Sequence, residues 1–248
     1  MGALSRLLAA LALAIAQPAA AIPCRLALAM GFDVSRSVDR AAHEIQIRGI
    51  LAALFDPEIR ALLTDPSGIT ALAVYEWSGR REQQLVVNWT PIRTEADIDR
   101  VARAIAIHGR SYNGLTAVGA ALSYGRRLLA RAPACDARIL DIAGDGQNND
   151  GPSPATIYAR QDFGDITVNA LAIGGHESNL LPWFEANVIR GPGAFAEYAP
   201  THQHFAEALR RKLIRELTPP LFGALPGTQA ASSPASAFSI SATVSPTP

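Results

Sequence analysis

The chain has 248 residues, 49% of them hydrophobic, and its 22 basic residues are balanced by 22 acidic residues. A net charge of zero, with no block of like charges, argues against the broad basic surface of a nucleic-acid-binding protein. The length and composition suit a single domain with one substantial core.

The first 21 residues have the composition of a cleavable secretory signal. Arg6 precedes an apolar stretch from Leu7 to Ala16, and small residues lead up to Ala21, where we expect cleavage. The apolar stretch is shorter than the roughly 20 residues that span a bilayer, so we expect no membrane span after cleavage. A lipid anchor on Cys24 is an alternative that Pro23 disfavours. Export predicts a secreted or periplasmic bacterial protein.

Two cysteines, Cys24 and Cys135, remain after such processing. An exported chain meets an oxidising compartment, where an even cysteine count indicates a disulfide. Each cysteine lies just before a predicted strand. If those strands are parallel neighbours, both thiols lie at the same edge of the sheet. We therefore predict an intramolecular bond between Cys24 and Cys135, with two unpaired thiols as the alternative.

Apolar runs alternate with segments of helical period along residues 22–218, which predicts one domain with crossover connections on a mostly parallel sheet. Strands are expected at 26–32, 69–78, 83–89, 138–144, 166–174 and, weakly, 194–199, and helices at 39–55, 57–63, 95–107, 117–130, 154–161, 178–188 and 202–217. The short connection 79–82 suits a hairpin, so strand 83–89 is expected to be an antiparallel edge. The predicted fold class is α/β, a Rossmann-like open sheet with helices on both faces. Residues 219–248, rich in Pro, Ser, Ala and Thr, are expected to form a disordered tail.

Oxygen-bearing side chains follow the predicted strands at one edge of this sheet. Asp33, Ser35 and Ser37 lie in "FDVSRSVD" after the first strand, Thr116 lies in "GLTAVGAAL", and Asp145 lies in "AGDGQNNDG" after the fourth strand. Ligands of open parallel sheets bind beyond the carboxyl ends of the strands, where such loops meet. Two carboxylates and three hydroxyls make an all-oxygen set, which suits magnesium, manganese or calcium better than zinc or copper.

These motifs resemble those of a von Willebrand factor A-type domain with a metal-ion-dependent adhesion site. The D-x-S-x-S motif corresponds to Asp33, Ser35 and Ser37, the T-x-x-G-x-A-L motif begins at Thr116, and Asp145 is in the D-G pair. The stretch "VYEWSG" further resembles a poorly characterised exported bacterial group of this family. The resemblance implies that the three hydroxyls bind the ion, most readily Mg²⁺, with Mn²⁺ or Ca²⁺ as alternatives. The two aspartates bind it directly or through water.

The resemblance also implies what such a site does. One coordination position stays open and is filled by an Asp or Glu of a partner protein, so the domain binds proteins through a shared cation. The alternative is a structural or assembly protein of the same fold without a functional metal site. We expect no enzyme, because no serine lies in G-x-S-x-G and the histidines fall in helices or ordinary loops.

Three local features of the predicted site allow more than one interpretation. Many family members have glycine between the two serines, where this chain has Arg36, so a positive φ there would strain the backbone. Ser35 and Ser37 could instead cap the first helix. Residues 147–149, "QNN", are interpreted as a polar rim around the site.

Overall fold

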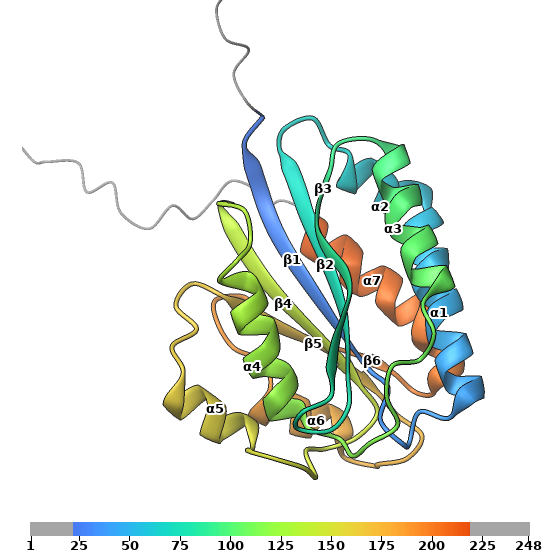
Figure 1. Cartoon of the computed structure of the whole chain (residues 1–248), viewed down its shortest axis with the longest axis vertical. Helices are drawn as coiled ribbons and strands as arrows, with labels where there is room; N and C mark the ends of the chain where they lie inside the picture. Colours follow the sequence, from blue (N-terminus) through green and yellow to red (C-terminus); the bar gives the residue numbers. More distant parts are fainter. Residues whose placement is uncertain (1–21, 219–248) are drawn as a thin grey trace, which may run out of the picture. The chain divides into compact units, whose positions relative to one another are not determined.

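The computed structural model describes residues 22–218, so the predicted signal 1–21 and tail 219–248 lie outside the described residues. The strands are β1 (Cys24–Asp33), β2 (Ile69–Trp77), β3 (Gln83–Ile92), β4 (Ala137–Gly144), β5 (Thr167–Ile173) and β6 (Ala196–Ala199). The helices are α1 (Arg40–Phe55), α2 (Pro57–Leu63), α3 (Glu95–Ile107), α4 (Val118–Leu129), α5 (Pro154–Arg160), α6 (Leu180–Asn187), the short 3-10 helix η1 (His202–His204) and α7 (Phe205–Leu217). Each predicted element is present with shifts of a few residues at its ends (Figure 1).

The strands form one sheet in the order β3-β2-β1-β4-β5-β6. All neighbours are parallel except β2 and β3, which confirms the predicted α/β class with an antiparallel edge. The edge strand runs three residues further than predicted, through Pro91 to Ile92. A proline is tolerated there because the outer side of an edge strand needs no donor. The order reverses at β1, which places a switch point between β1 and β4.

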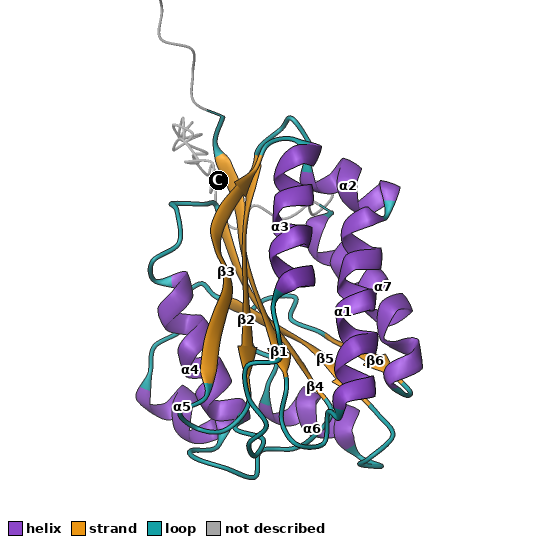
Figure 2. Cartoon of the chain, turned by 45° about the vertical axis from the view of Figure 1, so that its right-hand side comes forward, coloured by secondary structure: helices purple, strands orange, loops and turns teal. Residues whose placement is uncertain are grey.

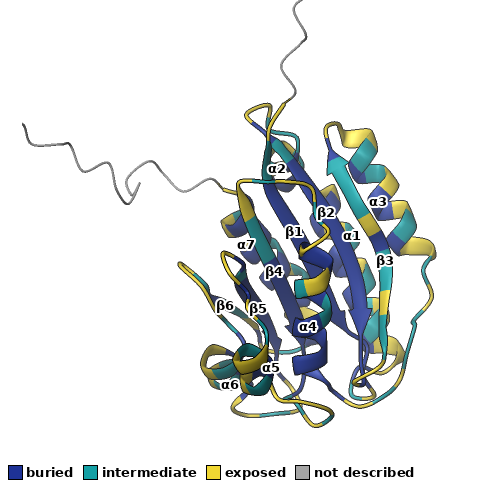
Figure 3. Ribbon diagram, turned by 60° about the vertical axis from the view of Figure 1, so that its left-hand side comes forward, coloured by how far each residue is buried: buried dark blue, intermediate teal, exposed yellow. Residues whose placement is uncertain are grey.

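Helices cover both faces of the sheet (Figure 2). Leu28 and Met30 of β1 pack in one core with residues of α1, α2, α3 and α7, whereas Ala27 and Ala29 pack in the other with residues of α4, α5 and α6. Because successive side chains of a strand point to opposite faces, a strand buried on both sides is apolar throughout. This accounts for the unbroken apolar runs in the sequence and for the buried central strands (Figure 3).

The predicted disulfide is present, between Cys24 at the start of β1 and Cys135 just before β4. The two Cα atoms are 4.5 Å apart, because β1 and β4 are parallel neighbours with Leu26 opposite Ala137. The bond therefore ties the amino ends of the two strands whose carboxyl ends carry Asp33 and Asp145. None of the helices in residues 22–218 has both the length and the apolar character that crossing a bilayer requires.

A buried ion pair fixes α7 to the sheet. The Lys212 ammonium lies 2.7 Å from Oδ1 of Asp141 on β4 and also contacts Glu216 one turn along its own helix. Burial raises the pKa of Asp141 to about 7, although the nearby lysine acts in the opposite direction. Removing one member of such a group leaves uncompensated buried charge, so α7 and the η1 segment before it have a defined place on the sheet.

Candidate metal centre

The segment after β1 turns from strand to helix within six residues. Asp33 ends the strand, and its Oδ1 accepts a hydrogen bond of 2.7 Å from the backbone N–H of Ser35. Asp39 caps α1 by accepting from the N–H of Ala42 at 2.8 Å. The serines therefore do not cap the helix, and the alternative in which they do is wrong. Arg36 is exposed and has no positive φ, so it fits without the backbone strain that a left-handed residue would cause.

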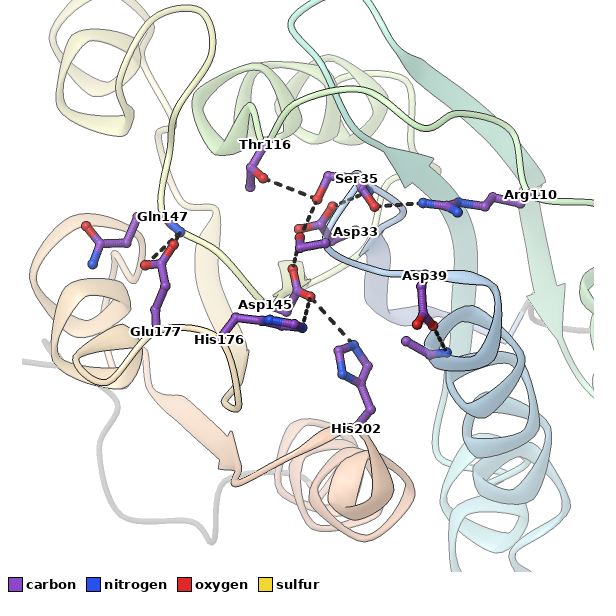
Figure 4. Close-up of polar contacts among 12 residues, drawn as sticks. Asp33, Ser35, Asp39, Arg110, Thr116, Asp145, Gln147, His176, Glu177 and His202 are labelled. Carbon is purple, nitrogen blue, oxygen red and sulfur yellow. Dashed lines mark hydrogen bonds and ion pairs between the residues drawn. The ribbon is translucent and has the colours of Figure 1, made fainter.

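The structure brings the predicted site residues together at the carboxyl ends of β1 and β4 (Figure 4). The hydroxyl of Ser37 donates to Oδ1 of Asp145 at 2.6 Å. The hydroxyl of Ser35 lies 3.2 Å from that of Ser37 and accepts a 3.2 Å bond from the hydroxyl of Thr116. Asp33 lies beside them at the end of β1 (Figure 4). Three separate loops thus supply one cluster of oxygens.

The two carboxylates of this cluster are fully buried. Oδ2 of Asp33 and Oδ2 of Asp145 have no hydrogen-bond partner within the described residues. Burial, and secondly the charge of Asp145, raise the pKa of Asp33 to about 8. Buried polar atoms normally have partners, so two unpartnered carboxylate oxygens in one place call for a positive group. A divalent cation fits them, and the hydroxyls complete an oxygen set of the kind that hard cations prefer.

The backbone of Thr116 is held by the loop after β4, whose residues 147–149 are interpreted from the sequence as a polar rim. Oδ1 of Asn149 accepts from the N–H of Thr116 at 2.8 Å, and the N–H of Asn149 donates to the carbonyl of Thr116 at 2.8 Å. Oδ1 of Asn148 accepts from the N–H of Gly119 at the start of α4. Both asparagines therefore clamp the threonine loop to the loop after β4. The sequence offers no signal for this, because an amide in a loop serves equally well as a solvated rim.

Replacing Asn149 with alanine is expected to weaken cation binding about 10-fold without unfolding the protein, since it removes an orienting bond rather than a ligand. Isothermal titration with Mg²⁺ measures the change, and Asn88→Ala on the edge strand β3 is the control. An affinity equal to that of the unchanged protein would mean that the Thr116 loop keeps its position without the amide.

Arg110 and Glu76 fix the other side of the cluster. The Arg110 guanidinium donates from Nη2 to the carbonyls of Val34 and Ser35, at 2.9 and 2.7 Å. Glu76, in the "VYEWSG" stretch, accepts from the N–H of Ser111 at 2.8 Å. Burial raises the pKa of Glu76, but hydrogen bonds from His43 and Ser111 outweigh it and leave that pKa below its ordinary value. Arg110 thus holds the segment that leads to Thr116 against the serine-bearing segment after β1, and Glu76 holds the same segment against β2.

A family model described as "Protein of unknown function (DUF1194)" matches residues 23–221. The chain belongs to the DUF1194 family. Its sheet order and helix layers are those of a von Willebrand factor A-type fold, which confirms the expected resemblance. No curated protein sequence matches the chain.

Solved structures with this fold come from several sources. A von Willebrand factor type A protein from Catenulispora acidiphila aligns with a TM-score of 0.57 and 17% identity, over 79% of this chain and 43% of that one. Proximal thread matrix protein 1 from the mussel byssus, with a zinc-occupied MIDAS motif, aligns at 0.56 and 18%, over 79% and 46%. The PilB minor pilin from Streptococcus sanguinis aligns at 0.55 and 14%, over 82% and 64%. The DUF1194 chain therefore matches less than two thirds of each of these proteins.

Two histidines stand beside Asp145, where the sequence indicated only ordinary helix and loop positions. His176 follows β5 and is half exposed, whereas His202 begins η1 and is buried. Burial lowers the pKa of His202, against the opposing effect of Asp145. Neither the spacing nor the surroundings of these histidines in the sequence indicates this position. It depends on how the chain after β5 returns to the edge of the sheet.

Proposed function

We propose that this DUF1194 protein is a cation-dependent protein-binding module of the adhesion type. Asp33, Ser35, Ser37, Thr116 and Asp145 would hold one divalent cation, most readily Mg²⁺, with Mn²⁺ or Ca²⁺ as alternatives. The ion would in turn bind an Asp or Glu of a partner protein. The observation that carries the proposal is the meeting of three hydroxyls with two fully buried carboxylates, of which Asp33 keeps an Oδ2 without a partner in the described residues.

The charges of these residues determine how each would contribute to cation binding. The two carboxylates formally neutralise a divalent ion, and the neutral hydroxyls add only weak donation. A bound ion would therefore attract one further anion in a partly dry site, where charge interactions are stronger than in water. A carboxylate of the partner supplies that anion. The chain's contribution is to hold the oxygens in place through the Asn149, Arg110 and Glu76 contacts.

Further observations support export, a non-enzymatic role and an adhesion or assembly role in turn. The disulfide suits an oxidising compartment, in keeping with a secreted or periplasmic protein. The serine hydroxyls bond to Asp145 and to each other, and within the described residues neither bonds to a histidine, as a nucleophilic serine would. The pilin and the matrix protein of similar fold suit an adhesion or assembly role for this chain as well.

Calorimetric titration of the full chain with Mg²⁺, Mn²⁺ and Ca²⁺ tests the cation. We expect binding that Ser35→Ala abolishes and that Ser153→Ala, an exposed helix-capping serine, leaves unchanged. Affinity capture from the cell envelope should then yield a partner that chelator and Ser35→Ala both release. No heat with any of the three ions would reject the proposal and favour an assembly protein whose site binds no metal.

A further inference from the structure

A pocket adjoins the oxygen cluster on the histidine side of Asp145. It has a volume of about 290 Å³ and is lined in part by Ser37, Asp39, His176, Thr201 and His202. The loop after β5 and the η1 segment form one wall, and the start of α1 forms the other. Its lining offers hydroxyl, carboxylate and imidazole groups, and the imidazoles distinguish it from the all-oxygen cluster next to it.

Two imidazole nitrogens approach one carboxylate oxygen beside this pocket. Nε2 of His176 lies 3.9 Å and Nε2 of His202 lies 3.8 Å from the same atom, Oδ2 of Asp145. Figure 4 shows both rings directed at this carboxylate from the side opposite Thr116. The other oxygen, Oδ1, accepts the bond from Ser37, so the carboxylate divides its two oxygens between the hydroxyls and the imidazoles.

Two of these three atoms are buried without a partner. Oδ2 of Asp145 and Nε2 of His202 form no hydrogen bond within residues 22–218, although the side chains are 0% and 9% exposed. At 3.8 Å they are too far apart to bond to each other. Buried polar atoms normally have hydrogen-bond partners, so a group that bonds to both atoms at once would be strongly favoured.

We propose that Asp145, His176 and His202 bind a transition-metal ion of the zinc class, at a position separate from the hydroxyl-lined one. Zinc binds imidazole nitrogen and carboxylate oxygen at about 2.0–2.2 Å, which places two ligand atoms of a tetrahedral ion roughly 3.4 Å apart. The two gaps exceed this by about half an ångström. No three His, Cys, Asp or Glu side chains of the described residues are already arranged as a metal site, so the ion must draw both rings inward.

The chemistry of the ligands selects the ion. Imidazole nitrogen suits zinc and its neighbours, whereas magnesium and calcium take oxygen ligands. Three protein ligands leave a fourth position for water or for a group of a bound molecule in the open pocket. The acidic Asp39 in the lining adds to the attraction for a cation. The two neighbouring positions would thus respond to different metals and share only Asp145.

The test uses the full chain without a histidine tag and a chromophoric zinc chelator as competitor. His176→Ala and His202→Gln are each expected to weaken Zn²⁺ binding at least 10-fold, the lower end of what supporting groups alone contribute. His204→Gln on the same η1 segment, whose ring bonds to Thr201, is the matched control and should bind zinc normally. In ¹⁵N spectra, zinc should shift the ring nitrogens of His176 and His202 but not those of His43.

Ser35→Ala separates this inference from the proposed function. It should abolish Mg²⁺ binding and leave Zn²⁺ binding unchanged, whereas His176→Ala should weaken Zn²⁺ binding and leave Mg²⁺ binding unchanged. Equal zinc affinity in both histidine variants and the unchanged protein would overturn the inference. Such a result would not bear on the proposed function, which the Mg²⁺ titration tests separately. Because His176 is half exposed, its variant keeps the test decisive if His202→Gln fails to fold.

Discussion

Replacing Asp33 with asparagine is expected to weaken Mg²⁺ binding strongly and, at the same time, to stabilise the cation-free protein. The carboxyl is fully buried, and Asp145 beside it raises its pKa further. An amide has nearly the same shape and can still accept from the N–H of Ser35 through its oxygen. It carries no charge, so the cost of burying a carboxylate near a second one is removed while the ion loses a ligand.

We expect cation affinity to fall at least about 100-fold, beyond the loss typical for groups that only support a ligand. Stability in chelator should rise by about 1–3 kcal/mol, the usual cost of an uncompensated buried polar group. Thermal unfolding with chelator and with excess Mg²⁺ measures both effects. Asp136→Asn, on the exposed turn before β4, is the control and should change neither. A variant that is less stable than the unchanged protein in chelator would show that the carboxyl serves the fold and not an ion.

Removing the disulfide through Cys24→Ala with Cys135→Ala is expected to lower the free energy of unfolding by about 4–5 kcal/mol. The bond closes a segment with a sequence separation of 111 residues, and so large a loop restricts the unfolded chain strongly. The native contacts of β1 with β4 should survive, because the backbone ladder between them does not involve the cysteines.

Urea unfolding with and without a thiol reductant measures this effect. The unchanged protein should become less stable on reduction, and the double variant should not respond to the reductant. A difference below about 1 kcal/mol between oxidised and reduced protein would contradict the loop-entropy account, since it lies far below the expected range. The same experiment indicates how far the protein depends on an oxidising compartment, which bears on the proposed export.

Much of the architecture could be predicted because local sequence patterns determine it. The buried central strands read as continuous apolar runs, and the alternation with helical periods fixed the crossover order. The short turn at 79–82 identified the antiparallel edge, and the position of each cysteine before a strand identified the disulfide. The ends of the edge elements were less predictable. The last residues of β3 were not predicted as strand, because Pro91 is unfavourable inside a strand. The pattern for β6 was weak, because this strand has only four residues.

The sequence by itself determined which oxygens gather at the edge of the sheet. Asp33, Ser35 and Asp145 directly follow or end strands, and parallel strands carry such residues to the same edge whatever the rest of the chain does. The tertiary structure alone decided what surrounds them. The clamp by Asn149 and the approach of His176 and His202 to Asp145 depend on the paths of long loops. Those paths follow from packing between distant elements, such as the buried contact of α7 with β4, and no local pattern encodes them.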